Sequence, residues 1–139
     1  MAKIGHVFGT LSAVVAGAVL FRLTRYEVAE DSMEPSLSEG DWVIGLKRPK
    51  GIRRGDVVVF EHPRTEGFDL VKRVAAAPRG RIHGRTMSER EMWVESDNPV
   101  EGTVDSRILG PIPLELLRAR VLVRYKPLPP VTIPVTRPG

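Results

Sequence analysis

Beyond Arg25, glycine and proline divide the chain into short stretches that are rich in valine and isoleucine. This pattern is typical of an all-β domain, because β-branched residues favour extended strands while glycine and proline favour turns. A chain of 139 residues has room for one such domain. We expect strands over residues 42–46, 56–61, 70–76, 92–95 and 119–125.

Three further segments have their own signals. Residues 62–67 are polar and contain proline and glycine, so we expect them to close a hairpin between the second and third strands. Residues 113–117 are expected to form one helical turn. Beyond Lys126, five prolines exclude a regular helix or a central strand. We expect this proline-rich tail, residues 127–139, to wrap the surface or to be disordered.

Residues 4–21 form a run of 18 residues without Asp, Glu, Lys or Arg, bounded by Lys3 and Arg22. As a helix, at about 1.5 Å per residue, the run would span roughly 27 Å, close to the roughly 30 Å of a bilayer core. We therefore expect a membrane anchor over residues 1–25 and a β-rich domain over residues 26–126. A cleaved signal peptide and a buried core helix are the alternatives. Charge alone does not orient the anchor, because basic residues flank both ends.

The residues that the chain lacks exclude several chemistries. It has no cysteine, which excludes disulfides, thiolate zinc sites and a cysteine nucleophile. The three histidines, His6, His62 and His83, have no metal-ligand spacing, and no glycine-rich phosphate loop occurs. We expect neither a cofactor nor a metal. If the chain is an enzyme that uses neither cysteine, metal nor histidine, the remaining route to a nucleophile is a serine or threonine that a lysine activates.

Lys72 is the lysine whose position needs an explanation, because it is a charged residue inside the expected strand over residues 70–76. Strand alternation places Leu70, Lys72 and Val74 on one face. If that face is buried, loss of hydration lowers the pKa of the amine from its usual value of about 10.4 and favours the neutral form. A solvent-exposed lysine on an edge strand is the alternative.

Four segments in order carry a resemblance to a known family. They read Asp31-Ser32-Met33-Glu34-Pro35-Ser36, then Arg54-Gly55-Asp56-Val57-Val58-Val59-Phe60, then Val71-Lys72-Arg73-Val74, and finally Asp97-Asn98 with Thr103-Val104-Asp105-Ser106-Arg107. In residue type and order these segments resemble the type I signal peptidase family of serine proteases. The resemblance extends from about residue 30 to residue 113, which is most of the chain.

The resemblance implies a role for each matching residue. Ser32 falls on the position of the nucleophile, beside Met33 and Pro35 of the same box, and Lys72 falls on the position of the general base. Thr103 matches a serine that hydrogen-bonds to the lysine and orients it. Asp105 and Arg107 match a structural salt bridge, which we interpret as a scaffold pair near the site.

Two positions depart from the family pattern. Many bacterial relatives have glycine or a hydroxyl residue two positions before the nucleophile, where this chain has Glu30. A carboxylate cannot donate a hydrogen bond to an oxyanion, so the second oxyanion donor is left open, while the backbone N–H of Ser32 is a candidate for the first. Ser96 replaces the glycine that usually precedes the Asp-Asn pair.

The family also implies a fold, an activity and a location. The expected fold is mostly β, with signal-peptidase-like coiled antiparallel β-sheets and one N-terminal transmembrane helix. The implied activity is that of a membrane-bound serine endopeptidase that cleaves signal or pro-peptides from precursor proteins. Its partners would be a precursor polypeptide bound in extended conformation and membrane lipid, with no nucleic acid. The implied location is a single-pass membrane protein whose catalytic domain lies on the extracytoplasmic side.

The short segment between Lys72 and Trp93 resembles the compact members of the family, the inner-membrane proteases of mitochondria and the proteases that mature nickel superoxide dismutase. Three alternatives are open. A self-cleaving repressor shares the serine-lysine dyad, but residues 1–31 do not supply a helix-turn-helix. A non-catalytic basic β-barrel that binds nucleic acid would suit the net charge of +4, although stacking aromatics are not evident. A catalytically dead relative could be retained for binding.

Overall fold

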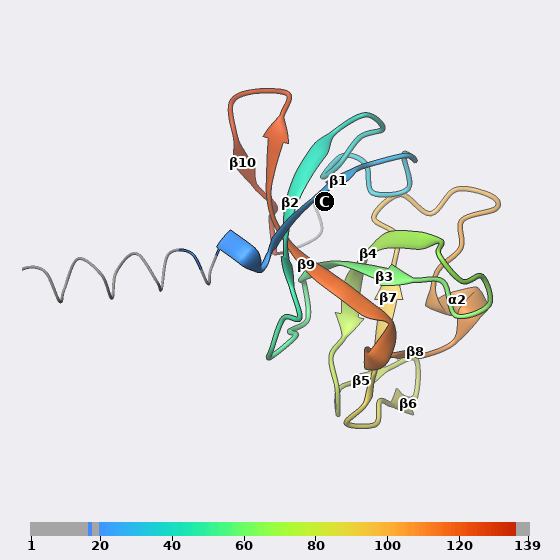
Figure 1. Ribbon diagram of the computed structural model, residues 1–139. Coiled ribbons are helices and arrows are strands. Elements are labelled where there is room, and N and C mark those ends of the chain that lie inside the picture. The colour runs from blue at the N-terminus through green and yellow to red at the C-terminus, as the bar shows by residue number, and fades with distance from the viewer. Residues whose placement is uncertain (1–16, 18–19, 136–139) are drawn as a thin grey trace, which may run out of the picture.

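The computed structural model describes residues 17 and 20–135, which are arranged around a coiled antiparallel sheet (Figure 1). The strands are β1 (Leu23–Glu27), β2 (Trp42–Lys47), β3 (Val57–Glu61), β4 (Asp69–Ala76), β5 (Arg81–Ile82), β6 (Arg85–Thr86), β7 (Glu91–Glu95), β8 (Ile112–Pro113), β9 (Leu117–Lys126) and β10 (Val131–Thr132). Two short helices, α2 (Ser106–Leu109) and the 3-10 turn η1 (Leu114–Leu116), lie between β7 and β9.

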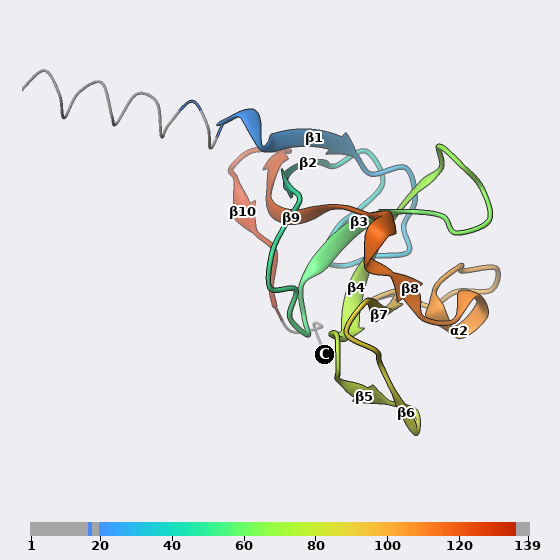
Figure 2. The same cartoon turned by 60° about the horizontal axis from the view of Figure 1, so that its bottom comes forward.

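The main sheet has eight strands in the order β1-β2-β9-β3-β4-β7-β8, and β10 pairs with β9 outside this path. Each pairing within it is antiparallel. Strands β5 and β6 form a separate small hairpin, which projects from the body of the domain (Figure 2). The long strand β9 joins the two halves of the sheet, because β2 pairs along one edge of it and β3 along the other.

Strand β3 lies where the two main cores meet, and four of its five residues are buried. Its alternate side chains point to opposite faces. Val57 and Val59 pack into a first core with Met33, Leu37, Val43 and their neighbours. Val58 and Phe60 pack into a second core with Leu70, Val74, Met92 and Ile112. A strand buried on both faces reads as a continuous apolar run, which explains the sequence Val-Val-Val-Phe at this position.

The five strands that the sequence predicts are all present as β2, β3, β4, β7 and β9. The expected hairpin is also confirmed, since β3 and β4 pair directly and Glu61 is opposite Asp69. The helical turn expected over residues 113–117 is present as η1. The sequence did not predict β1, β5, β6, β8, β10 or α2, and β1 begins three residues before the boundary expected for the β-rich domain.

The predicted transmembrane helix over residues 4–21 lies almost entirely outside the described residues. Within residues 17 and 20–135, no helix is long and apolar enough to cross a membrane. In the proline-rich tail, the described part returns along the body of the domain. Val131 and Thr132 pair with Arg124 and Val123 of β9.

Candidate active site

Ser32 lies in the long loop that joins β1 to β2. Two backbone hydrogen bonds close the base of this loop, from the Val28 N–H to the Asp41 carbonyl at 2.8 Å and from the Gly40 N–H to the Val28 carbonyl at 2.8 Å. Met33 and Leu37 are fully buried in the first core and hold the loop against it. The loop is therefore an ordered part of the domain, fixed by hydrogen bonds at its base and by the apolar burial of two of its side chains.

The turn itself positions the Ser32 hydroxyl. The Glu34 N–H donates to the Asp31 carbonyl at 3.0 Å, and the following peptide bond to Pro35 is cis. Pro35 is exposed, whereas Met33 points into the core. From the opposite side, the Asn98 N–H donates to the Ser32 carbonyl at 2.9 Å. No described residue accepts a hydrogen bond from the Ser32 N–H.

Lys72 meets Ser32 from the middle of β4. Its Nζ is 2.7 Å from the Ser32 Oγ, and the two form a hydrogen bond. Lys72 is 1% exposed and Ser32 is 4% exposed. The face of β4 that carries Leu70, Lys72 and Val74 is buried, as the alternation predicts, so the alternative of an exposed lysine is wrong. Forty residues of sequence separate the two side chains.

Burial lowers the pKa of Lys72 below its ordinary value, because the charged ammonium loses its hydration. The negative charges of Glu30 and Asp105 act in the opposite direction and favour the ammonium, but burial has the larger effect. A lowered pKa increases the fraction of neutral amine at a given pH. The neutral amine has a lone pair that can accept the proton of the Ser32 hydroxyl, so the pair has the chemistry of a nucleophile and its general base.

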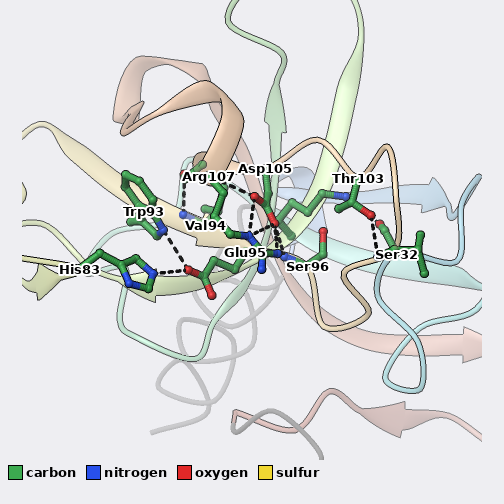
Figure 3. A network of polar contacts seen from close by, with 12 residues as sticks. Ser32, His83, Trp93, Val94, Glu95, Ser96, Thr103, Asp105 and Arg107 are labelled. Carbon is green, nitrogen blue, oxygen red and sulfur yellow. Dashed lines mark hydrogen bonds and ion pairs between the residues drawn. The ribbon is translucent and has the colours of Figure 1, made fainter.

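Asp105 and Arg107 form an ion pair at the start of α2 (Figure 3). Asp105 is 1% exposed, and it also accepts hydrogen bonds from the Ser96 and Arg107 backbone N–H groups, each at 3.0 Å. Burial by itself would raise the pKa of Asp105, but the hydrogen bond from the Arg107 side chain, the two backbone hydrogen bonds and the Arg107 charge together outweigh it, and the pKa lies below its usual value. Asp105 thus remains ionised, caps the helix and places a negative charge close enough to favour the ammonium form of Lys72.

Thr103 lies near Ser32 in Figure 3, and both residues line one polar hollow. Its hydroxyl accepts a hydrogen bond from the Val100 N–H at 3.1 Å. No hydrogen bond joins Thr103 to Lys72 in the described part of the chain. Ser96, the other departure discussed above, is 1% exposed, and its hydroxyl has no hydrogen-bond partner among the described residues.

Arg73 is a structural centre of the site that the sequence analysis did not identify. Its guanidinium forms a bidentate pair with Asp97, with both N–O distances at 2.8 Å. It also donates to the Gly55 carbonyl at 2.8 Å, to the Ser36 hydroxyl at 3.1 Å and to the Pro134 carbonyl. Four separate segments, including the loop that contains Ser32 and the tail, therefore meet at one buried cation. Arg73 and Asp97 both lie within the four sequence segments quoted above. Their place in those segments is the signal from which their role in the site could have been predicted.

A cavity of about 210 Å³ opens beside Ser32 and Lys72. Its walls come mainly from residues 26–32 on one side and residues 68–72 of the β3–β4 loop and β4 on the other. Most of its surface is apolar, with Val28, Val43 and Val59 among the lining residues. A second, more polar hollow adjoins the same segment and shares Ala29, Glu30 and Ser32 with the first.

The described histidines take no part in the Ser32–Lys72 pair. The His62 Nδ1 accepts from the Arg64 N–H, and the His83 Nε2 is 2.9 Å from Glu95, which also accepts from Trp93 (Figure 3). His6 lies outside the described residues. Within the described part of the chain, no group of three or more potential ligands could hold a metal ion.

Comparison with known proteins matches this chain to one family and to several relatives with related names. The family described as "Signal peptidase, peptidase S26" matches residues 1–86, a segment that contains both Ser32 and Lys72. Mitochondrial inner membrane protease subunit 1 of Homo sapiens is 31% identical over 110 residues, which cover 70% of this chain and 66% of the human protein. The protein of the same name in Schizosaccharomyces pombe is 30% identical over 111 residues and 70% of each chain.

Signal peptidase I of Buchnera aphidicola is 29% identical over 80 residues, which cover 47% of this chain and 26% of the bacterial protein. Against subunit 1 of human, mouse and Xenopus tropicalis, the matched segment spans just under two thirds of the relative, at 66%, 65% and 65%. The resemblance inferred from the four sequence segments is confirmed.

Proposed function

The chain belongs to the signal peptidase family, peptidase S26, and from this premise we propose that it is a membrane-bound serine endopeptidase that removes signal or pro-peptides from precursor proteins. The observation that carries the proposal is the contact between the Ser32 Oγ and the Lys72 Nζ, 2.7 Å apart and almost completely buried. A hydroxyl and a desolvated amine at this distance are a nucleophile and a base within hydrogen-bond reach.

The proposed reaction begins with neutral Lys72. As the Ser32 Oγ attacks the carbonyl carbon of the scissile peptide bond, its proton passes to the Lys72 Nζ. The resulting ammonium then gives that proton to the leaving nitrogen, the C–N bond breaks, and an ester remains on Ser32. Water attacks the ester in the second half, with Lys72 again accepting a proton and returning it to the Ser32 oxygen. Lys72 thus performs the role that histidine has in a Ser-His-Asp triad.

The negative oxygen of the tetrahedral intermediate needs hydrogen-bond donors. The Ser32 N–H is suited to this, because no described residue accepts from it. Glu30 cannot be the second donor when ionised, since a carboxylate only accepts hydrogen bonds. We assign one donor to the backbone of Ser32.

The supporting residues act by position. Asp105 and Arg107 hold the start of α2 beside β7, and the Asp105 charge limits how far the pKa of Lys72 falls. Met33 fixes the loop by its burial, and Pro35 belongs to the turn that contains Ser32. Thr103 lines the polar hollow beside Ser32, and the family resemblance gives it the role of orienting Lys72, although no hydrogen bond joins the two side chains in the described part of the chain.

Substrate would bind in extended form in the apolar cavity between residues 26–32 and residues 68–72. An extended peptide placed there could pair with the backbone on either side, as peptides do when they add a strand to a sheet. The small, apolar lining suits small side chains before the scissile bond, as the family resemblance also implies.

Membrane association is supported by the mitochondrial relatives, which are inner membrane proteases by name. We propose that residues 4–21 form a single transmembrane anchor and that the β-rich domain lies on the extracytoplasmic side. The ten residues from Arg22 to Asp31 reach at most about 35 Å when fully extended, so Ser32 works near the bilayer surface. A cleavage site just outside a membrane helix suits this position.

The test is to incubate the detergent-solubilised full chain with a set of secretory precursors and to sequence any new amino termini. Wild type should generate discrete termini that follow small residues, and Ser32→Ala should generate none. New termini that also arise with Ser32→Ala would contradict the assignment of Ser32. Complete absence of cleavage by wild type across the set would contradict the proposed activity.

A further inference from the structure

Glu30 occupies a position that the proposed reaction leaves without a role. It is exposed, precedes Ser32 by two residues, and lines three hollows around the site: the apolar cavity, the polar hollow that also contains Ser32 and Thr103, and a third hollow bounded by Phe68 and Val104. Its carboxylate is one of the charges that act on Lys72. A carboxylate at the junction of these hollows lies beside any peptide that reaches Ser32.

The polar hollow has a strongly one-sided charge. Four carboxylates line it, those of Glu30, Asp31, Glu39 and Glu101, and none of its described lining residues is basic. The whole chain, by contrast, has a net charge of +4. Ser32, which is 4% exposed and whose hydroxyl is hydrogen-bonded to Lys72, also lines this hollow. The acidic lining therefore belongs to the reaction site and not to an unrelated surface.

The two hollows fix the direction in which a substrate runs. The apolar cavity and the acidic hollow share Ala29, Glu30 and Ser32, so they adjoin across the nucleophile. A peptide whose small residues before the scissile bond occupy the apolar cavity would continue after the bond into the acidic hollow, because Ser32 lines that hollow and does not line the third one. Its first residues beyond the cut then lie among the carboxylates.

We infer that Glu30 is a specificity-determining residue, which selects precursors with a lysine or arginine in the first two positions after the scissile bond. This inference rests on the proposed function and names its substrate class. Each exposed pair of opposite charges changes a binding equilibrium by about 1.4-fold to fivefold. With several carboxylates acting on one side chain, attraction of lysine and repulsion of glutamate together give a preference of about tenfold at low ionic strength.

The experiment uses three peptides with the same small residues before the bond and lysine, glutamine or glutamate as the first residue after it. A second set varies the second residue. For the detergent-solubilised full chain, kcat/KM should fall in the order lysine, glutamine, glutamate, with about a tenfold difference between the ends. Glu30→Gln should reduce this ratio to about threefold, and 1 M salt should reduce it further, because the Debye length is then about 3 Å.

Glu115→Gln is the matched control, since it removes the same charge from an exposed position in η1 that lines none of these hollows. It should leave the ratio unchanged. Cleavage of the glutamine peptide with a lysine-to-glutamate ratio near one would overturn this inference while leaving the proposed function intact. A ratio that Glu30→Gln leaves unchanged would also overturn it. Failure to cleave any peptide would instead overturn the proposed function and this inference together.

Discussion

Replacing Arg73 with methionine should lower the free energy of unfolding by about 3–5 kcal/mol, because it removes a buried cation that donates two hydrogen bonds to the buried Asp97 carboxylate. The side chains of Arg73 and Asp97 are 7% and 1% exposed. Once the guanidinium is gone, Asp97 keeps the Ser36 hydroxyl, which donates to it at 2.8 Å, but loses both hydrogen bonds from the arginine.

The size of the expected loss can be compared with the stability of the whole domain. A domain of this length has a free energy of unfolding of roughly 5–15 kcal/mol, so the substitution would remove a large part of it. The Gly55 and Pro134 carbonyls also lose a donor, which adds to the loss where they stay buried. The double variant Arg73→Met/Asp97→Leu should recover part of this stability, since apolar residues can replace a buried ion pair at little cost.

The assay is urea unfolding of the full chain in detergent, followed through the fluorescence of its two tryptophans. The exposed Arg64 supplies the matched control, and Arg64→Met should change the free energy of unfolding by less than about 0.5 kcal/mol. An Arg73→Met variant within about 1 kcal/mol of wild type would refute the reasoning. A double variant that loses as much as the two single variants combined would show that the two side chains are not coupled.

Three further predictions follow from the site and its surroundings. Gly55→Ala should lower the free energy of unfolding by about 1–3 kcal/mol, because φ is +96° there and a Cβ would lie 2.1 Å from the Val135 carbonyl oxygen. Urea unfolding measures this change, and a neutral effect would contradict the placement of the tail. Glu30→Gln should move the alkaline rise of kcat to lower pH, because the Glu30 charge raises the pKa of Lys72 and its removal favours the neutral base; an unchanged or upward-shifted profile would contradict the coupling. The full chain should remain in the membrane pellet after an alkaline wash, and its appearance in the supernatant would contradict the anchor.

The sequence is informative about the central strands because their patterns are strong. The first four residues of β3 form an uninterrupted apolar run. In β4, alternation places Leu70, Lys72 and Val74 on one face, and the structure buries that face. β1 was missed because its sequence, Leu-Thr-Arg-Tyr-Glu, is polar and lies at the edge of the sheet, where one side faces solvent. β5, β6, β8 and β10 have two residues each, too few for any periodicity to be visible.

For the candidate site too, the sequence predicts some features and misses others. The alternation in β4 predicts a buried Lys72, but only the fold brings it to a serine 40 residues away, in the loop between β1 and β2. Arg73 was not recognised because alternation places it on the opposite face of the same strand, which the sequence does not show to be covered. β4 lies between β3 and β7, and both of its faces pack against protein, so Lys72 and Arg73 are both buried.

The cleavage rate of the Lys72→Arg variant tests the serine-lysine mechanism most directly. Arginine keeps the positive charge but does not release its proton at any useful pH, so it cannot accept the proton of Ser32. For a peptide with small residues before the scissile bond, wild type should show a rate that rises toward alkaline pH with a midpoint below about 10.4. Lys72→Arg should retain less than about one part in a thousand of that rate at every pH, like Ser32→Ala, while His62→Ala and His83→Ala remain active. Substantial cleavage by Lys72→Arg, or loss of the alkaline rise in either histidine variant, would contradict the dyad.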